Sequence, residues 1–191
     1  EKPTATSSSW YVRSASSEEI EHAQNIAGQL NVHPLVAHLM ILRGIARVDE
    51  MNLFLQAPLK DLPDPSLLAD CDRAARRLLD ALCQDEHIVI YGDYDVDGVT
   101  SSALLWRYFK EAFDVDLEIY IPNRLTEGYG LNSEAIKLIA SSGAQLLVTV
   151  DNGSSAIDEV QLAQSLGLDV VIIDHHTVSD PEPPAFAHLN P

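Results

Sequence analysis

The stretch that decides the fold is residues 87–98, HIVIYGDYDVDG, in which a short apolar run ends in three aspartates at alternate positions. The run is rich in β-branched residues, which predicts a buried strand. A helix-like segment, residues 99–112, follows the glycine that closes the motif. Neighbouring carboxylates repel one another, and hard cations such as Mg²⁺ and Mn²⁺ prefer carboxylate oxygen. We therefore predict a metal site at the C-terminal tip of this strand.

Strands and helices alternate beyond this motif. Apolar, β-branched runs occupy residues 117–121, 146–150 and 170–173, and helix-like segments occupy residues 133–142 and 154–166. Strands that are apolar throughout are typical of a parallel sheet that is covered on both faces. We predict an α/β fold with a doubly wound, mostly parallel sheet.

The chain before the sheet has a helical pattern. We divide the sequence into a disordered lead-in, a helical N-terminal region and a sheet domain, at residues 1–15, 16–85 and 86–191. Within the helical region, the sequence predicts a capped helix start at Ser16 and a second helix start at Pro34. It also predicts a longer amphipathic helix over residues 66–82. We assign no chemistry to these helices.

Each predicted strand ends in a polar cluster. The clusters are GDYDVDG at 92–98, PNR at 122–124, DNG at 151–153 and DHH at 174–176. The DNG cluster alone would also fit an ordinary turn. However, the carboxyl ends of the strands lie along one edge of a doubly wound sheet, where ligands bind. We therefore expect carboxylates and imidazoles that are far apart in the sequence to meet in one crevice.

The residues expected at this crevice suit divalent metals and phosphate. They are Asp93, Asp95, Asp97, Arg124, Asp151, Asp174, His175 and His176. An EF-hand is disfavoured because Leu104 occupies the position where that calcium loop needs a glutamate. No glycine pattern of the dinucleotide or P-loop type occurs. Carboxylates and histidines are the residue types that bind the ions of two-metal hydrolases acting on phosphate esters. Arg124 could bind a phosphate.

Composition limits the other classes of function. The formal net charge of −17 argues against a large nucleic-acid-binding face within these residues. It does not exclude nucleic acid as a substrate, because metal ions can carry the local positive charge. No apolar run approaches the length of a membrane span, and we expect no secretory signal. The two isolated cysteines, Cys71 and Cys83, favour a reducing cytoplasm.

The motifs at 92–98, 151–153 and 174–176 resemble the first three motifs of the DHH phosphoesterase superfamily. Within it, PNR at 122–124 with EGYGL at 127–131 is similar to the RecJ family of bacterial exonucleases, which are specific for single-stranded DNA. The resemblance implies a metal-dependent 5′→3′ exonuclease that hydrolyses phosphodiester bonds of single-stranded DNA in repair and recombination. It also implies two Mn²⁺ or Mg²⁺ ions and attack by a bridging hydroxide. The partners it suggests are single-stranded DNA, a single-strand-binding protein and a helicase.

The resemblance also implies a role for each site residue. Asp95 would bind the first metal, Asp97 and His175 the second, and Asp151 both. Asp93 and Asp174 would be supporting acids of the catalytic site, and Asp174 would form hydrogen bonds to the metal ligands without binding a metal itself. His176 would contact the scissile phosphate, and Arg124 a substrate phosphate.

Two departures from the superfamily pattern matter. In many relatives a histidine that ligates the first metal stands where this chain has Tyr91. The fourth motif of the superfamily does not occur, so we expect an N-terminal fragment whose sheet domain is incomplete and which is inactive in isolation. Two alternatives remain open. One is a DHH enzyme acting on oligoribonucleotides, cyclic dinucleotides or pyrophosphate, and the other is a non-catalytic RecJ-like replication scaffold.

Overall fold

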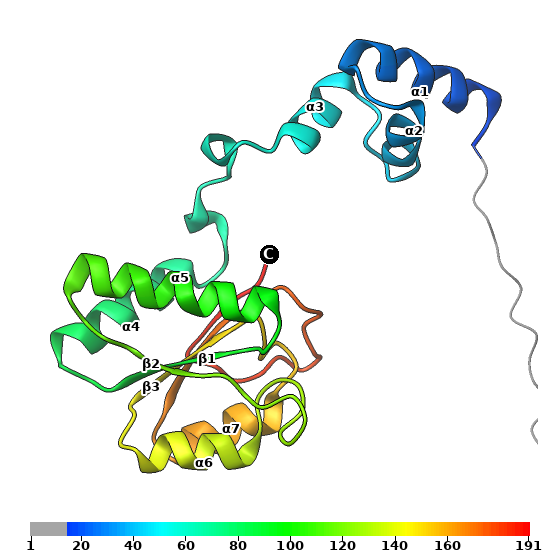
Figure 1. The fold of residues 1–191 in the computed structure, drawn as a ribbon. Coiled ribbons are helices and arrows are strands. Elements are labelled where there is room, and N and C mark those ends of the chain that lie inside the picture. The colour runs from blue at the N-terminus through cyan, green and yellow to red at the C-terminus, as the bar shows by residue number, and fades with distance from the viewer. Residues whose placement is uncertain (1–14) are drawn as a thin grey trace, which may run out of the picture. The chain divides into compact units, whose positions relative to one another are not determined.

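The computed structural model describes residues 15–191, so the predicted lead-in lies outside the described residues except for its last position. The chain forms two compact units, Glu1–Pro63 and Asp64–Pro191 (Figure 1).

The first unit is helical. It contains α1 (Ser17–Leu30), α2 (Pro34–Leu42), α3 (Val48–Gln56) and a 3₁₀ turn, η1 (Leu59–Asp61). The predicted helix starts are confirmed: Ser16 caps α1 in a capping box with Glu19, and Pro34 is the first residue of α2. Ile26, Met40 and Met51 are buried in a small core shared by the three helices.

The second unit begins with a short 3₁₀ turn, η2 (Pro65–Leu67), and then α4 (Cys71–Cys83). The prediction of one helix over residues 66–82 is wrong at its start. Leu68 is extended, and Asp70 has a left-handed backbone with a φ of 58°, so an α-helix cannot run through them. Ala74 and Ala81 of α4 are buried against the sheet, so this helix lies in the second unit although the sequence grouped it with the N-terminal helices.

Five parallel strands form the sheet of the second unit. They are β1 (Ile88–Gly92), β2 (Glu118–Tyr120), β3 (Leu146–Val150), β4 (Asp169–Ile173) and β5 (Ala187–Leu189), in the order β2-β1-β3-β4-β5. The predicted α/β class and the parallel sheet are confirmed. The fifth strand was not predicted, because it is three residues long and contains no β-branched residue.

Helices cover both faces of the sheet. The remaining helices are α5 (Val96–Phe113), α6 (Ser133–Ser141) and α7 (Ile157–Ser165). α4 and α5 lie on one face, and α6 and α7 lie on the other (Figure 1). Ile88 and Ile90 of β1 pack towards α5, while Val89 and Tyr91 pack towards α6 and α7. β1 and β3 are buried at every position, which explains their continuous apolar runs.

The strand order positions the site. From β1 the chain crosses to β2 at the edge of the sheet, and from there it returns past β1 to β3. Connections that leave neighbouring strands in opposite directions open a crevice at the carboxyl ends of those strands. The aspartate-rich motif follows β1 and the DNG motif follows β3, so both lie at this crevice. None of the described helices is both long and apolar enough to cross a lipid bilayer.

Candidate metal centre

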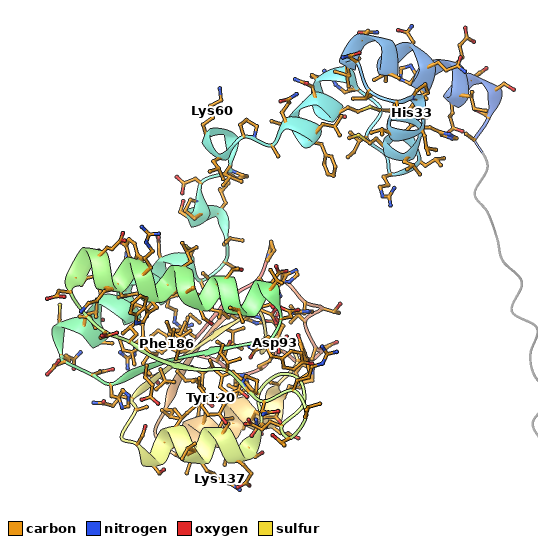
Figure 2. The ribbon with its side chains drawn as sticks, viewed as in Figure 1. His33, Lys60, Asp93, Tyr120, Lys137 and Phe186 are labelled. Carbon is orange, nitrogen blue, oxygen red and sulfur yellow. The ribbon has the colours of Figure 1, made fainter. Side chains whose placement is uncertain are left out.

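The first part of the site is the junction between β1 and α5, where Figure 2 labels Asp93. Asp95 is the N-cap of α5, and its Oδ1 accepts the backbone N–H groups of Asp97 and Gly98 at 2.9 and 3.2 Å. The hydrogen bond from Gly98, together with that from Asp97, lowers the pKa of Asp95. The alternate spacing of the aspartates therefore also has a local cause, because one of them starts the helix.

Asp93 is the buried member of this motif, with 1% of its surface exposed. Its Oδ1 has no hydrogen-bond partner among residues 15–191. A buried, unpaired carboxylate oxygen is costly unless something positive or a donor lies against it. The backbone of Asp93 packs directly on Gly98, where an added Cβ would lie 2.4 Å from the Asp93 nitrogen. A glycine at position 98 is therefore required for this close approach.

The second part of the site is the turn after β3. Asp151 is 6% exposed and has a left-handed backbone with a φ of 63°. Strained backbone of this kind in non-glycine residues is concentrated at functional sites. Burial of Asp151 and the nearby carboxylate of Asp95 raise its pKa, against the opposing effect of His175 and His176. A cation bound beside Asp151 and Asp95 would offset both the burial of Asp151 and the repulsion between the two carboxylates.

The third part is the Asp174-His175-His176 motif after β4. His175 Nε2 lies 3.0 Å from Asp151 Oδ1, and His176 Nδ1 lies 2.7 Å from Asp174 Oδ1. Burial alone would raise the pKa of Asp174, but hydrogen bonds from Ser154 and His176 outweigh it and lower the pKa to about 2. The bond to Asp174 raises the pKa of His176. Asp174 thus fixes the orientation of the His176 ring, as carboxylates that accept the second N–H of a metal-binding histidine do.

These parts meet in two groups that could each hold a metal ion. Asp93, Asp95 and Asp151 form one group, and Asp151, His175 and His176 form the other, each with ligand atoms within 4.8 Å of one another. Asp151 is common to both. The all-oxygen group suits a hard cation, and the group with imidazoles suits Mn²⁺ or Zn²⁺ as well. Together with the unpaired oxygen of Asp93, this donor set fits a divalent metal centre.

Asp97 lies at the same crevice but belongs to neither group found in the described chain. It lines a pocket of about 330 Å³ together with Asp151, Asp174 and His175. The structure therefore groups Asp93 with Asp151, whereas the roles inferred from the sequence made Asp93 only a supporting acid. The role of Asp97 as a metal ligand stays a prediction.

The loop after β2 reaches the site through Arg124 and Tyr129. The Arg124 guanidinium lies 5.3 Å from the centre of the ring of Tyr94, the residue between Asp93 and Asp95 in the sequence. The Tyr129 hydroxyl lies 3.5 Å from the Asp151 carbonyl oxygen and 3.2 Å from His176 Nε2. Sequence reasoning missed Tyr129 as a site residue, although the glycines on both sides of it mark an exposed loop.

The same loop is held by polar contacts that range from exposed to buried. Glu127 accepts the Tyr120 hydroxyl at 2.5 Å and the Asn123 N–H at 2.8 Å. The Tyr91 hydroxyl donates to the Gly130 carbonyl at 2.9 Å. Burial raises the pKa of Tyr91, and its ring stacks on that of Tyr120. Tyr91 is therefore part of the core beneath the loop. It belongs to neither of the two metal-binding groups found among residues 15–191.

Comparisons with known proteins agree with this geometry. A family model described as the DHH family, N-terminal domain, matches residues 87–191. The single-stranded-DNA-specific exonuclease RecJ of Bacillus subtilis (strain 168) is 38% identical over 171 residues, which are 90% of this chain and 22% of that protein.

Two solved structures are also similar. The structure of RecJ in complex with Mn²⁺ from Thermus thermophilus matches with a TM-score of 0.62 and 29% identity, over 90% of this chain and 23% of that chain. A manganese-bound exonuclease RecJ matches with a TM-score of 0.60 and 35% identity, over 68% of this chain and 32% of that chain. The chain thus spans 22–32% of the length of these three relatives.

Proposed function

The chain belongs to the DHH family and is homologous to RecJ, and from this premise we propose that it forms the metal-binding part of a 5′→3′ exonuclease acting on single-stranded DNA. The reaction would be hydrolysis of phosphodiester bonds. Because the chain spans about a quarter of the length of its relatives, the activity of a whole RecJ protein is part of the proposal.

One observation carries the proposal: a single buried carboxylate, Asp151, is shared by two groups of ligand atoms. A shared carboxylate is what a pair of neighbouring ions requires. When bound, two Mn²⁺ or Mg²⁺ ions would supply an activated water near neutral pH and positive charge opposite the phosphate. The relatives whose structures match contain manganese, which supports the choice of metal.

The residues of this chain divide the remaining tasks. Asp93, Asp95 and Asp151 would hold one cation, and Asp151 with His175 would hold the other, with Asp97 lining the same pocket. Asp174 accepts a hydrogen bond from His176 Nδ1 and thereby orients the ring, and we assign the ring to the scissile phosphate. Arg124, held over Tyr94, would bind a substrate phosphate.

The acidic character of the chain is consistent with this division. With a net charge of −17, the chain cannot rely on a broad basic surface to attract DNA. Bound cations and Arg124 would instead concentrate positive charge where the phosphate must lie. This predicts that binding of nucleic acid depends on divalent metal.

Calorimetric titration of the chain with MnCl₂ tests the metal centre. We expect the wild-type chain to bind Mn²⁺. Asp151→Asn should weaken binding at both groups, because it removes the negative charge that they share. Asp158→Asn, on the exposed first turn of α7, is the matched control and should bind as the wild type does. A chain that binds no Mn²⁺, or an Asp151→Asn variant that binds it unchanged, would exclude the proposal and favour a non-catalytic scaffold.

The substrate is tested with the natural gene product that contains this sequence. We expect Mn²⁺-dependent release of mononucleotides from the 5′ end of single-stranded DNA, and little digestion of duplex DNA. Faster turnover of a dinucleotide or of pyrophosphate would instead assign the protein to another branch of the DHH family.

A further inference from the structure

The turn that follows β3 contains a buried asparagine that the proposed function does not use. Asn152 is 1% exposed. Its side-chain amide donates to the Val150 carbonyl at 2.9 Å and to the Tyr91 carbonyl at 3.3 Å. Its own side-chain oxygen is buried without a partner in the part of the chain that the structure describes. The amide therefore connects the end of β3 to the end of β1.

The orientation of this amide has a physical reason. If its oxygen and nitrogen were exchanged, the oxygen would face two carbonyl oxygens and both bonds would be lost. The observed orientation keeps both donors on the strand ends and leaves one acceptor unpaired. An unpaired buried acceptor is unfavourable, so the two donated bonds are the feature that this arrangement preserves.

Other bonds extend the connection to a third strand. The Asp151 N–H donates to the Ile173 carbonyl of β4 at 2.9 Å, and the Ser154 N–H donates to Asp174 at 2.9 Å. The Thr149 hydroxyl donates to the Asn152 carbonyl at 2.9 Å. The turn thus joins the ends of β1, β3 and β4, which carry the ligands of both groups.

We propose that Asn152 is a positioning residue of the metal centre, which sets the gap between the β1 end, with Asp93 and Asp95, and the β3 end, with Asp151. The inference rests on the proposed metal-dependent function. Asp151 has a left-handed backbone with a φ of 63°, a conformation that costs free energy and persists where the surrounding structure enforces it. Without the Asn152 amide, the two strand ends lose a direct side-chain connection at the place where one cation must contact both.

Two substitutions separate positioning from charge. Asn152→Asp has the same shape but removes the donors and adds a negative charge, which by itself would strengthen cation binding. Asn152→Ala removes the donors without adding charge. We expect both variants to bind Mn²⁺ about 10–100-fold more weakly than the wild type, the usual effect of losing a residue that supports metal ligands. Tighter binding by Asn152→Asp alone would overturn the inference, because charge would then explain the result.

Calorimetry with MnCl₂ and urea unfolding in EDTA are measured on the same proteins. Asn52→Asp, on an exposed position of α3, controls for the chemical change and should leave Mn²⁺ affinity unchanged. Variants of Asn152 that are less stable but bind Mn²⁺ as the wild type does would show a purely structural role. If the wild type binds no Mn²⁺, the proposed function itself fails, which is a different result.

A milder variant decides the matter if both Asn152 variants fail to fold. Thr149→Val keeps the size of the side chain and removes only the hydroxyl that donates to the Asn152 carbonyl. We expect a smaller loss of Mn²⁺ affinity, of about a few-fold, in a folded protein. Unchanged affinity in this variant, with Asn152 variants unfolded, would count against positioning by the turn.

Discussion

Replacement of Gly98 by alanine tests whether the close packing of α5 on β1 builds the metal centre. An added Cβ would lie 2.4 Å from both the nitrogen and the carbonyl oxygen of Asp93. Ordinary contacts of a Cβ begin at 3.4 Å, so the start of α5 would have to move by about 1 Å (3.4 − 2.4). Because the obstructing atoms are backbone, they cannot rotate away. The movement would displace both Asp93 and the helix cap at Asp95.

The sign of the effect is diagnostic. In a helix with free space, glycine to alanine stabilises by about 1 kcal/mol. Overpacking instead costs about 1–3 kcal/mol or more. We therefore expect Gly98→Ala to lower the free energy of unfolding by at least about 1 kcal/mol and to weaken Mn²⁺ binding.

The assay is urea unfolding in EDTA followed by circular dichroism, with calorimetric titration of MnCl₂ on the folded protein. Gly28→Ala in α1 is the matched control, because no described atom lies within 4 Å of its added Cβ. It should stabilise the helical unit by about 1 kcal/mol. If Gly98→Ala were as stable as the wild type and bound Mn²⁺ equally well, the packing argument for the site would be wrong.

Three further predictions concern single site residues. Asp93→Asn should raise the free energy of unfolding in EDTA by about 1–3 kcal/mol, because a neutral amide replaces a carboxylate whose buried Oδ1 has no hydrogen-bond partner among residues 15–191. In saturating Mn²⁺ the variant should instead be less stable than the wild type, because it binds the ion less well. The same order of stability in both buffers would contradict this. The pKa of Asp174 is about 2, below its ordinary value near 3.9, so its carboxylate stabilises the fold at higher pH and this contribution of about 2 kcal/mol is lost as the pH falls from about 4 through 2. Urea titrations in EDTA should therefore show a steeper acid loss in the wild type than in Asp174→Asn, and parallel curves would refute the assignment. Arg124→Ala should raise KM for single-stranded DNA about tenfold in the natural gene product, while calorimetry shows unchanged Mn²⁺ affinity. The reason is that the guanidinium lies over the Tyr94 ring and belongs to neither metal-binding group among residues 15–191. A matched loss of Mn²⁺ affinity would place Arg124 in the metal centre instead.

Local sequence predicted the elements that depend on neighbours along the chain. β1 and β3 are recognisable because they are mostly apolar and every position is buried. The capped helix start at Ser16 could also be predicted, because the residues that form the capping box lie within four positions of the sequence. The start of α4 was misplaced because an amphipathic pattern can run through a 3₁₀ turn and a left-handed residue, Asp70, without changing its period.

The sequence by itself determined that acidic and imidazole side chains follow successive parallel strands, and the polarity of such a sheet places strand ends on one edge. Only the tertiary structure decided which of them meet. It placed Asp93 and not Asp97 in a group with the shared Asp151, and it brought Asn152 and Tyr129 to the ends of strands that are remote in the chain. The physical reason is that the geometry of the ligands depends on distances of a few ångströms between strands. These distances follow from the strand order, the buried hydrogen bonds and the close approach at Gly98, and the pattern of apolar residues along the chain contains no information about them.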